Sequence, residues 1–400
     1  MRLRFILLAF ALGSLSYSCQ TPKPEKIAEL SSPDLKLKLE LFTQEQEEML
    51  FYTLSRGGEL LVDFSPIGMK ITGEQEWKFT SPKLTFFERD SLIYPLIAAK
   101  RKNFHDRFSG VKIEFEGPLD LELRMYDEGA AFRWVGQSSD SLKIQSETFE
   151  VNTTEASHLF YAPYEQVLPP SLGAFVMRQW ERIKGWVDES YPFENHFETQ
   201  YQYKSLEELA SRELLYSPAL IHTPSDHYLL VAESDVRDYP GMILKKSGNQ
   251  GVQATFAPFP LEEVIPVDTL IYSRLKKVSK AGDFIASTVG KRTFPWRVII
   301  ATDDPTVLPG SDLILKLASP SEITGDLSWI KPGQITDEWL VNANLFDVPF
   351  KAGKNTQTYL YYIDFVKEFG LEYIMVDEGW YRNGDLNKLN PDIDLEKIAA

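Results

Sequence analysis

The sequence predicts a multidomain chain: a large antiparallel β-sandwich followed by the start of a (β/α)8 TIM barrel that is incomplete. Apolar and polar residues alternate with period two in many short segments up to about residue 300. A strand, helix, strand pattern follows residue 326. The 400 residues, 43% of them hydrophobic, are more than one hydrophobic core usually organises.

The N-terminal segment, residues 1–19, predicts a lipoprotein-type export signal. Two arginines precede an apolar run from Phe5 to Leu12, as in a secretory signal peptide. The chain has a single cysteine, Cys19, which therefore has no disulfide partner and resembles a bacterial lipoprotein acceptor. Leu15 stands four positions before it rather than the usual three, so ordinary cleavage and a retained anchor remain alternatives. We expect export to the periplasm or outer membrane, membrane contact only through a lipid on Cys19, and a tether over 20–27.

The antiparallel sandwich is expected over residues 28–300. Leucines alternate with charged residues over 35–41, and apolar residues alternate with charged ones over 119–125, which is typical of a sheet with one solvated face. Further strand-like runs are separated by turn-rich pieces and cover 111–116, 141–151, 227–231, 251–256 and 298–301. Short strands in series with few helical stretches favour a sandwich.

The pattern changes after the sandwich. A loop rich in Asp, Pro and Gly is expected as a linker over 301–325, followed by a strand at Leu327–Ile330. Apolar residues at helical spacing predict a helix that begins at Asn355 or Thr356 and ends at Gly370. A second strand is expected at Tyr373–Val376, and the final residues, DLEKIAA, read as the opening of another helix.

This order predicts two parallel strands covered by helices, so residues 326–400 would form the first two β/α units of a barrel. Asp377 and Glu378 directly follow the second strand. The carboxyl ends of parallel strands are where barrels place their functional residues. Since neighbours on a strand point to opposite faces, we expect one of these two acids to enter the site and the other to point away.

Four segments of this part resemble the start of the catalytic barrel of glycoside hydrolase family 97: SWIKPGQ (328–334), NANLFDVPFKAGKNTQTYLYYIDF (342–365), EYIMVDEGWY (372–381) and NPDIDL (390–395). Four upstream segments resemble the N-terminal sandwich domain of the same family: RMYDEGAAFRW (124–134), AESDVRDYPGM (232–242), FAPFP (256–260) and FPWRVI (294–299). The resemblance implies an enzyme that hydrolyses α-glucosidic or α-galactosidic bonds of oligosaccharides and needs calcium.

The resemblance favours Glu378 in the substrate pocket, with Asp377 beside it. Lys331 follows the first expected strand, where its ammonium group could reach a sugar hydroxyl or pair with Asp377. Trp329 and Trp380 could stack on sugar rings, although large aromatic residues at strand ends more often pack in a core. Two asparagines in the loop after the first strand, Asn342 and Asn344, are further hydrogen-bonding candidates.

The main catalytic carboxyl groups are not assigned to any residue of this chain. A glycosidase needs two carboxyl groups flanking the scissile bond, and the adjacent residues Asp377 and Glu378 cannot be that pair. A closed barrel uses eight β/α units in about 250 residues, and two fit here. The resemblance places the catalytic residues on later strands, beyond residue 400, so we expect this chain alone to be inactive.

For calcium, the resemblance points to a glutamate delivered by the sandwich domain. The arrangement Phe-Glu-x-x-Tyr in FETQYQYKSL (197–206) nominates Glu198, with Glu194 as a nearby alternative. Calcium takes six to eight oxygen ligands. With the other ligands expected on the barrel, the affinity of this chain for calcium should be weak.

Other functions remain open at this point. The net charge of −16 disfavours nucleic acid and anionic lipid as partners. A non-catalytic surface lipoprotein that binds carbohydrate through its sandwich is the main alternative. An aldose-epimerase-like sandwich, suggested by the turn at 126–129, would need a His and Glu pair that the sequence does not place. The choice between glucose and galactose, between inversion and retention, and the oligomeric state also stay open.

Overall fold

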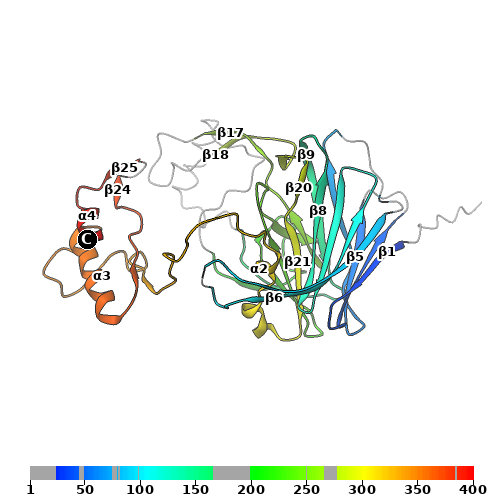
Figure 1. Ribbon diagram of the computed structural model, residues 1–400, viewed down its shortest axis with the longest axis horizontal. Helices are drawn as coiled ribbons and strands as arrows, with labels where there is room; N and C mark the ends of the chain where they lie inside the picture. The colour runs from blue at the N-terminus through cyan, green and yellow to red at the C-terminus, as the bar shows by residue number, and fades with distance from the viewer. Residues whose placement is uncertain are drawn as a thin grey trace, which may run out of the picture.

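Two large antiparallel sheets lie face to face in the computed structural model, and a smaller C-terminal group of helices and short strands lies beside them (Figure 1). The structure describes residues 24–44, 49–73, 79, 82–97, 99–164, 199–248, 250–264, 277–382 and 385–400. The sheets run from Glu25 to Thr302, close to the predicted sandwich. Cys19 lies outside the described residues.

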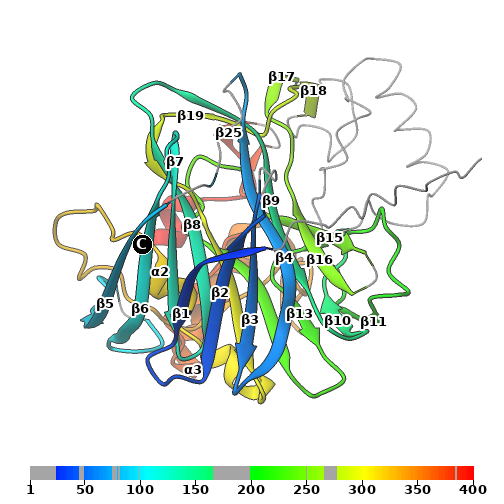
Figure 2. The ribbon, with the colours of Figure 1, turned by 90° about the vertical axis from the view of Figure 1, so that its right-hand side faces the viewer.

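The first sheet has nine strands among the residues that the structure describes, in the order β1-β2-β3-β4-β9-β16-β15-β12, and β19 also pairs with β9. Its strands are β1 (Glu25–Ser31), β2 (Leu37–Thr43), β3 (Leu50–Arg56), β4 (Glu59–Ile71), β9 (Leu142–Asn152), β12 (Leu214–Tyr216), β15 (Ile243–Ser247), β16 (Gly251–Thr255) and β19 (Ala286–Thr288). Figure 2 shows β1 to β4 running side by side.

The second sheet has ten strands in the described part of the chain, in the order β11-β10-β13-β14-β21-β8-β7-β6-β5, and β20 also pairs with β8. Its strands are β5 (Lys83–Ile93), β6 (Phe104–Glu114), β7 (Leu119–Tyr126), β8 (Gly129–Gln137), β10 (His158–Tyr161), β11 (Gln202–Ser205), β13 (Ala219–His222), β14 (Tyr228–Ser234), β20 (Lys291–Thr293) and β21 (Trp296–Thr302). A separate hairpin joins β17 (Pro260–Val264) and β18 (Lys277–Ala281).

The hydrophobic core lies between the two sheets. Alternate residues of β2, such as Leu37 and Leu39, meet alternate residues of β7, such as Leu121 and Leu123, in one buried cluster. The predicted alternation is therefore confirmed for these strands. It is wrong for Leu35, which is 80% exposed in a left-handed turn (φ 62°) before β2 begins.

The outer face of the second sheet is covered where the sequence predicted a solvated face. Glu122 on β7 is buried and accepts hydrogen bonds from Arg124 and Arg133. Both guanidinium groups lie over the ring of Trp296, at 4.6 and 4.3 Å from its centroid. Alternation distinguishes the two faces of a strand but does not reveal whether a second layer covers the polar face.

The second layer comes from the segment predicted as a linker. Residues 301–325 contain a 3₁₀ turn (Pro305–Gly310) and a short helix, α2 (Leu313–Leu317). Leu313 and Leu317 are buried in a cluster with Trp296 and Val298 of β21. The prediction of a loop is therefore wrong for α2, which becomes part of the sandwich by packing on β21.

The C-terminal part contains the predicted helix and a parallel strand pair. Helix α3 (Thr356–Phe369) begins after Asn355, whose side chain accepts a hydrogen bond from the Thr358 amide, and ends at Gly370 in the left-handed conformation. Strands β22 (Ile335–Thr336) and β23 (Tyr373–Ile374) pair in parallel on either side of α3 in sequence. The predicted helix and the parallel pairing are confirmed.

The first predicted strand is misplaced. Leu327–Ile330 forms a turn, because the Asp326 carboxylate accepts hydrogen bonds from the amide and hydroxyl of Ser328. The strand β22 begins at Ile335, eight residues after Leu327. Beyond β23, a hairpin joins β24 (Tyr381–Arg382) to β25 (Asp385–Leu389), and α4 (Leu395–Ala399) begins after Asp394 as predicted.

None of the helices in the described residues is both long and apolar enough to cross a membrane.

Candidate ligand site at the carboxyl ends of β22 and β23

The carboxyl ends of β22 and β23 lie next to each other because the two strands pair in parallel. Their last paired residues are Thr336 and Ile374. Asp377 and Glu378 follow β23 after two residues that belong to no strand or helix, and Glu378 begins a turn. The strand ends before both acids, so the alternation of a strand does not decide which of them faces the site. Asp377 is half-buried and Glu378 is exposed.

Glu338, which follows β22, is a residue that the sequence analysis missed. Its side chain is fully buried, and its Oε1 accepts hydrogen bonds from the Asp377 amide at 2.8 Å and from the Tyr359 hydroxyl at 3.2 Å. The sequence offered one pointer: Glu338 lies between two segments that resembled the start of a barrel, 328–334 and 342–365, and two residues after the end of β22. The misplaced first strand hid it.

Helix α3 supplies the Tyr359 hydroxyl. Tyr359 is buried on the first turn of the helix, directly after the cap that Asn355 provides. Burial, and then the adjacent Glu338 carboxylate, raise the pKa of the Tyr359 phenol above its ordinary value. The hydroxyl therefore remains protonated and can donate to Glu338 across the pH range in which the protein would work.

The turn that carries Glu378 is held by a second contact. The Lys354 ammonium group, just before α3, donates a hydrogen bond to the Glu378 carbonyl. Gly379 follows with φ 98°, and a Cβ at that position would overlap the Lys354 side chain. The backbone conformation therefore favours glycine at this position of DEGW, and a Cβ would also require the flexible Lys354 side chain to shift.

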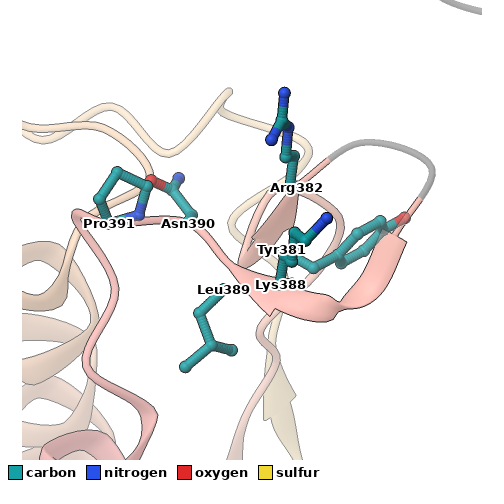
Figure 3. Close-up of a pocket in the computed structure, with 6 residues that line it drawn as sticks. All are labelled: Tyr381, Arg382, Lys388, Leu389, Asn390 and Pro391. Carbon is teal, nitrogen blue, oxygen red and sulfur yellow. The ribbon is translucent and has the colours of Figure 1, made fainter.

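The hairpin after this turn forms a hollow beside it. The Asn390 side chain donates to the Gly379 carbonyl at 2.8 Å, and the Asn390 amide donates to the Trp380 carbonyl at 2.9 Å. The hollow has a volume of about 640 Å³, and Figure 3 shows its lining residues: Tyr381, Arg382, Lys388, Leu389, Asn390 and Pro391. Trp380 is half-buried and packs edge-on against Tyr381, with 5.0 Å between ring centroids.

Two residues that were predicted to line the pocket, Trp329 and Lys331, show no interaction with Asp377 or Glu378 among the described residues. Trp329 is 74% exposed in the turn after Asp326. Lys331 is exposed, and its contact with β23 is through its backbone carbonyl, which accepts from the Tyr373 hydroxyl. Of the two roles considered for Lys331, the ion pair with Asp377 does not form between the described residues of this structure, and the contact with a sugar hydroxyl stays a prediction.

Asn342 and Asn344 lie in the loop after β22, and both are exposed. The loop folds back on itself: the Asn342 amide donates to the Trp339 carbonyl and the Ala343 amide donates to the Glu338 carbonyl. Asn342 has φ 52°, a left-handed conformation that asparagine tolerates better than most residues. Both side chains are therefore available to a ligand.

The described residues contain no group of three or more His, Cys, Asp or Glu side chains that could hold a metal ion. The calcium-ligand candidates Glu198 and Glu194 lie outside the described residues. The Glu338 carboxylate accepts hydrogen bonds from the Asp377 amide and the Tyr359 hydroxyl, and the Glu378 carbonyl accepts one from Lys354. These bonds hold the turn that carries Asp377 and Glu378 to the loop after β22 and to the start of α3.

Protein-family models match both the sandwich part and the C-terminal part of the chain. The model described as Glycosyl-hydrolase 97 N-terminal matches residues 30–320. The model described as Glycoside hydrolase 97 matches residues 338–400, a range that contains Glu338, Asp377 and Glu378.

Two curated relatives are informative. The chain is 29% identical over 405 residues to a retaining alpha-galactosidase of Bacteroides thetaiotaomicron, covering 100% of this chain and 56% of the relative. It is 23% identical over 376 residues to a probable retaining alpha-galactosidase of Streptomyces bingchenggensis, covering 89% of this chain and 46% of the relative. The chain therefore spans about half the length of these relatives.

Solved structures show the same fold. A family 97 enzyme from a Pseudoalteromonas species, solved in complex with acarbose, superposes with a TM-score of 0.68 at 19% identity, covering 92% of this chain and 51% of that one. A beta-arabinopyranosidase superposes with a TM-score of 0.62 at 21% identity, covering 87% of this chain and 50% of that one.

Proposed function

This chain belongs to glycoside hydrolase family 97, and on that premise we propose that it acts in the hydrolysis of α-galactosidic or α-glucosidic bonds of oligosaccharides. In this proposal it supplies the sandwich domain and the first two β/α units of an incomplete catalytic barrel. One curated relative is named as a retaining alpha-galactosidase and another as a probable one, which favours α-galactosides as substrates and retention as the stereochemical outcome.

One observation carries the proposal: the parallel pairing of β22 and β23 brings the segments that carry Glu338, Asp377 and Glu378 to the same carboxyl edge. Ligands of barrel enzymes bind at that edge. At that edge, carboxylates can accept hydrogen bonds from sugar hydroxyls, and amide N–H groups can donate hydrogen bonds to them. Glu378 is exposed and Asp377 is half-buried, so both can be reached by a sugar entering from solvent.

We propose that Glu378 and Asp377 bind sugar hydroxyls and do not form the catalytic pair. A retaining glycosidase places its two carboxyl groups about 5 to 5.5 Å apart on opposite sides of the scissile bond. Asp377 and Glu378 are neighbours in the chain and therefore cannot flank the scissile bond in this way. The catalytic nucleophile and acid are expected on strands beyond residue 400, which makes residues 1–400 alone inactive.

The test measures sugar binding by the chain itself. Purified protein is titrated with methyl α-galactoside and methyl α-glucoside, and binding is followed by ligand-observed NMR. We expect weak binding that is lost in Glu378→Gln and reduced in Asp377→Asn. Glu368→Gln, at an exposed acid on α3, is the matched control and should bind as the unchanged chain does.

Two results would contradict the proposal. Failure of the unchanged chain to bind either glycoside would exclude the sugar-binding role of the acid pair. Turnover of an aryl α-galactoside or α-glucoside by residues 1–400 would show that the catalytic pair is already present. Sequencing the gene past codon 400 and assaying the longer product would test the activity directly.

We also propose calcium as a cofactor, on the family resemblance alone. The described residues do not provide a set of ligands, and the candidate Glu198 lies outside them. Calcium needs six to eight oxygen ligands, so the affinity of this chain should be weak. Tight calcium binding in calorimetry would contradict this expectation.

Export as a lipoprotein remains a proposal that rests on the N-terminal sequence. Mass spectrometry of the mature N-terminus should find a diacylglyceryl group on Cys19, and Cys19→Ser should release the protein from the membrane fraction. An unmodified cysteine in the mature protein would contradict it.

A non-catalytic carbohydrate-binding role is the second candidate, and a cavity in the sandwich favours it. This cavity of about 540 Å³ is lined by aromatic and acidic residues that include Tyr216, Tyr239, Phe259, Glu233 and Asp238. Aromatic rings with nearby carboxylates suit sugar binding. Sugar binding that survives Glu378→Gln but is lost in Tyr216→Ala would favour this role over the first.

A further inference from the structure

Glu338 is unusual for its part of the chain. Among the described residues from 326 to 400, the buried side chains are otherwise neutral: Ala343, Thr358, Tyr359, Val366 and Ile393. A carboxyl group removed from water loses several kcal/mol of hydration unless hydrogen bonds replace it. The contacts that Glu338 makes therefore indicate what its burial accomplishes.

Both visible contacts of the Glu338 side chain use one oxygen. Oε1 accepts from the Asp377 amide at 2.8 Å and from the Tyr359 hydroxyl at 3.2 Å. Oε2 is buried and has no hydrogen-bond partner among the described residues. Because Oε2 is closed to solvent, a sugar cannot reach it in this conformation, and the side chain cannot act as a direct ligand.

The bond to Asp377 lies where the backbone ladder has stopped. The β22–β23 pairing ends at Thr336 and Ile374, three residues before Asp377. Beyond that point the Glu338 side chain takes the place of the next ladder bond and joins the two strand ends. Hydrogen bonds to a charged acceptor are stronger than neutral ones, so this contact fixes the Asp377 backbone firmly.

Glu338 also organises its own loop. Its backbone carbonyl accepts from the Ala343 amide at 2.7 Å, which closes the loop that presents Asn342 and Asn344. One residue thus connects the loop after β22, the first turn of α3 and the acid turn after β23. These are the three segments that carry the polar groups of the candidate site.

We propose that Glu338 is a positioning residue that holds the Asp377–Glu378 turn in its sugar-binding conformation through the Asp377 amide. That the turn binds sugar rests on the proposed function. That Glu338 fixes the conformation of the turn does not depend on it. In Glu338→Met the side-chain volume is largely kept but the acceptor is lost. In Glu338→Gln an oxygen remains for both donors.

The experiment uses ¹⁵N-labelled chain and two readouts. The first is the hydrogen-exchange rate and chemical shift of the Asp377 amide, with the α3 amides as a reference for folding. We expect exchange at Asp377 to become at least about tenfold faster in Glu338→Met, the change for one lost bond to a charged acceptor, and to be largely restored in Glu338→Gln. The second readout is the affinity for methyl α-galactoside, which should weaken about tenfold in Glu338→Met and stay within about threefold in Glu338→Gln.

Asp337→Asn is the matched control. This neighbouring acid is exposed, and its carboxylate accepts from the Trp339 amide at 3.2 Å. Asp337→Asn should leave both the exchange rate of the Asp377 amide and the affinity for methyl α-galactoside unchanged. If the α3 amides of Glu338→Met also exchange faster, that variant has lost its fold, and Glu338→Gln is then compared with the unchanged chain. We expect slow exchange of the Asp377 amide and unchanged sugar affinity in Glu338→Gln.

Three outcomes would overturn the inference. Unchanged exchange at Asp377 in a folded Glu338→Met chain would show that the side chain does not hold the turn. Loss of sugar binding in Glu338→Gln with Asp377 still protected would show that the carboxylate acts on the ligand itself. Loss of Asp377 protection in Glu338→Gln would exclude positioning by a hydrogen-bond acceptor. A chain that binds no sugar would reject the proposed function, and the exchange readout would still decide the role of Glu338.

Discussion

Arg297 on β21 and Glu147 on β9 form a two-pronged ion pair that is fully buried between the two sheets of the sandwich. Arg297 Nε donates to one Glu147 oxygen at 2.6 Å and Nη2 donates to the other at 2.7 Å. Arg297 also pairs with Glu233, and Tyr239 donates to Glu147. Burial alone would lower the pKa of Arg297, but the contacts with Glu147, together with the charge of Glu233, outweigh burial and raise the pKa, so the guanidinium stays charged.

Removing the arginine should therefore destabilise the sandwich strongly. Arg297→Met leaves the buried Glu147 and the partly buried Glu233 without their cation, and a broken buried pair costs about 3–5 kcal/mol. The free energy of unfolding is measured by denaturant titration. Lys83→Met, which breaks an exposed pair with Glu114, is the control and should cost less than about 1 kcal/mol. Equal effects of the two variants would contradict the assigned role of the buried pair.

His227 predicts a pH dependence of stability. Its ring nitrogens contact Asp303 at 2.7 Å and Glu59 at 3.1 Å, which joins the start of β14 to the start of β4 in the other sheet. Burial lowers the pKa of His227, but the bonds to Glu59 and Asp303 outweigh burial and raise it. The protonated ring thus stabilises the fold fully below the unfolded pKa near 6.5, and this contribution is lost as the pH rises through the raised pKa.

The measurement compares thermal unfolding between about pH 6 and pH 9. The unchanged chain should lose more stability over this range than His227→Gln. The difference should be below about 1 kcal/mol, because both carboxylates are more than half exposed. A steeper pH dependence in His227→Gln would show that the sign is wrong.

Helix α2 should contribute to the stability of the sandwich. Leu313 is buried against the outer face of the second sheet, so Leu313→Ala should cost about 2–5 kcal/mol. Leu315 lies on the same short helix but is 48% exposed, and Leu315→Ala should change stability by less than about 0.5 kcal/mol. Both are measured by denaturant unfolding. Similar small effects at the two positions would mean that α2 does not pack on the sheet in solution.

The ends of helix α3 should depend on two residues. Asn355→Ala removes the cap on the Thr358 amide and should cost about 1 kcal/mol, whereas Asn355→Asp keeps an acceptor and should cost little. Gly370→Ala forces a side chain into φ 73° and should also cost about 1 kcal/mol. Hydrogen exchange of the α3 amides reports these changes locally. Exchange in Asn355→Ala as slow as in Asn355→Asp would contradict the cap assignment.

The sequence determined the features that depend on contacts within a few residues. Alternation of apolar residues marked β2 and β7, and an asparagine cap with a glycine stop marked both ends of α3. The errors arose where a local signal was overlooked or a distant partner decided the outcome. Asp326 turned the chain at Ser328, where a strand was predicted, and the sheet beneath α2 recruited a segment predicted as a linker.

The tertiary structure alone decided which polar groups meet. Arg297 and Glu147 are 150 residues apart, and Glu338 and Asp377 are 39 apart, so no periodicity or cap links them in the sequence. Burial makes such pairs consequential, because a charge removed from water must find its partner within the fold. The acids of DEGW were visible as letters, but the buried carboxyl group that holds them became apparent only once β22 and β23 had been brought side by side.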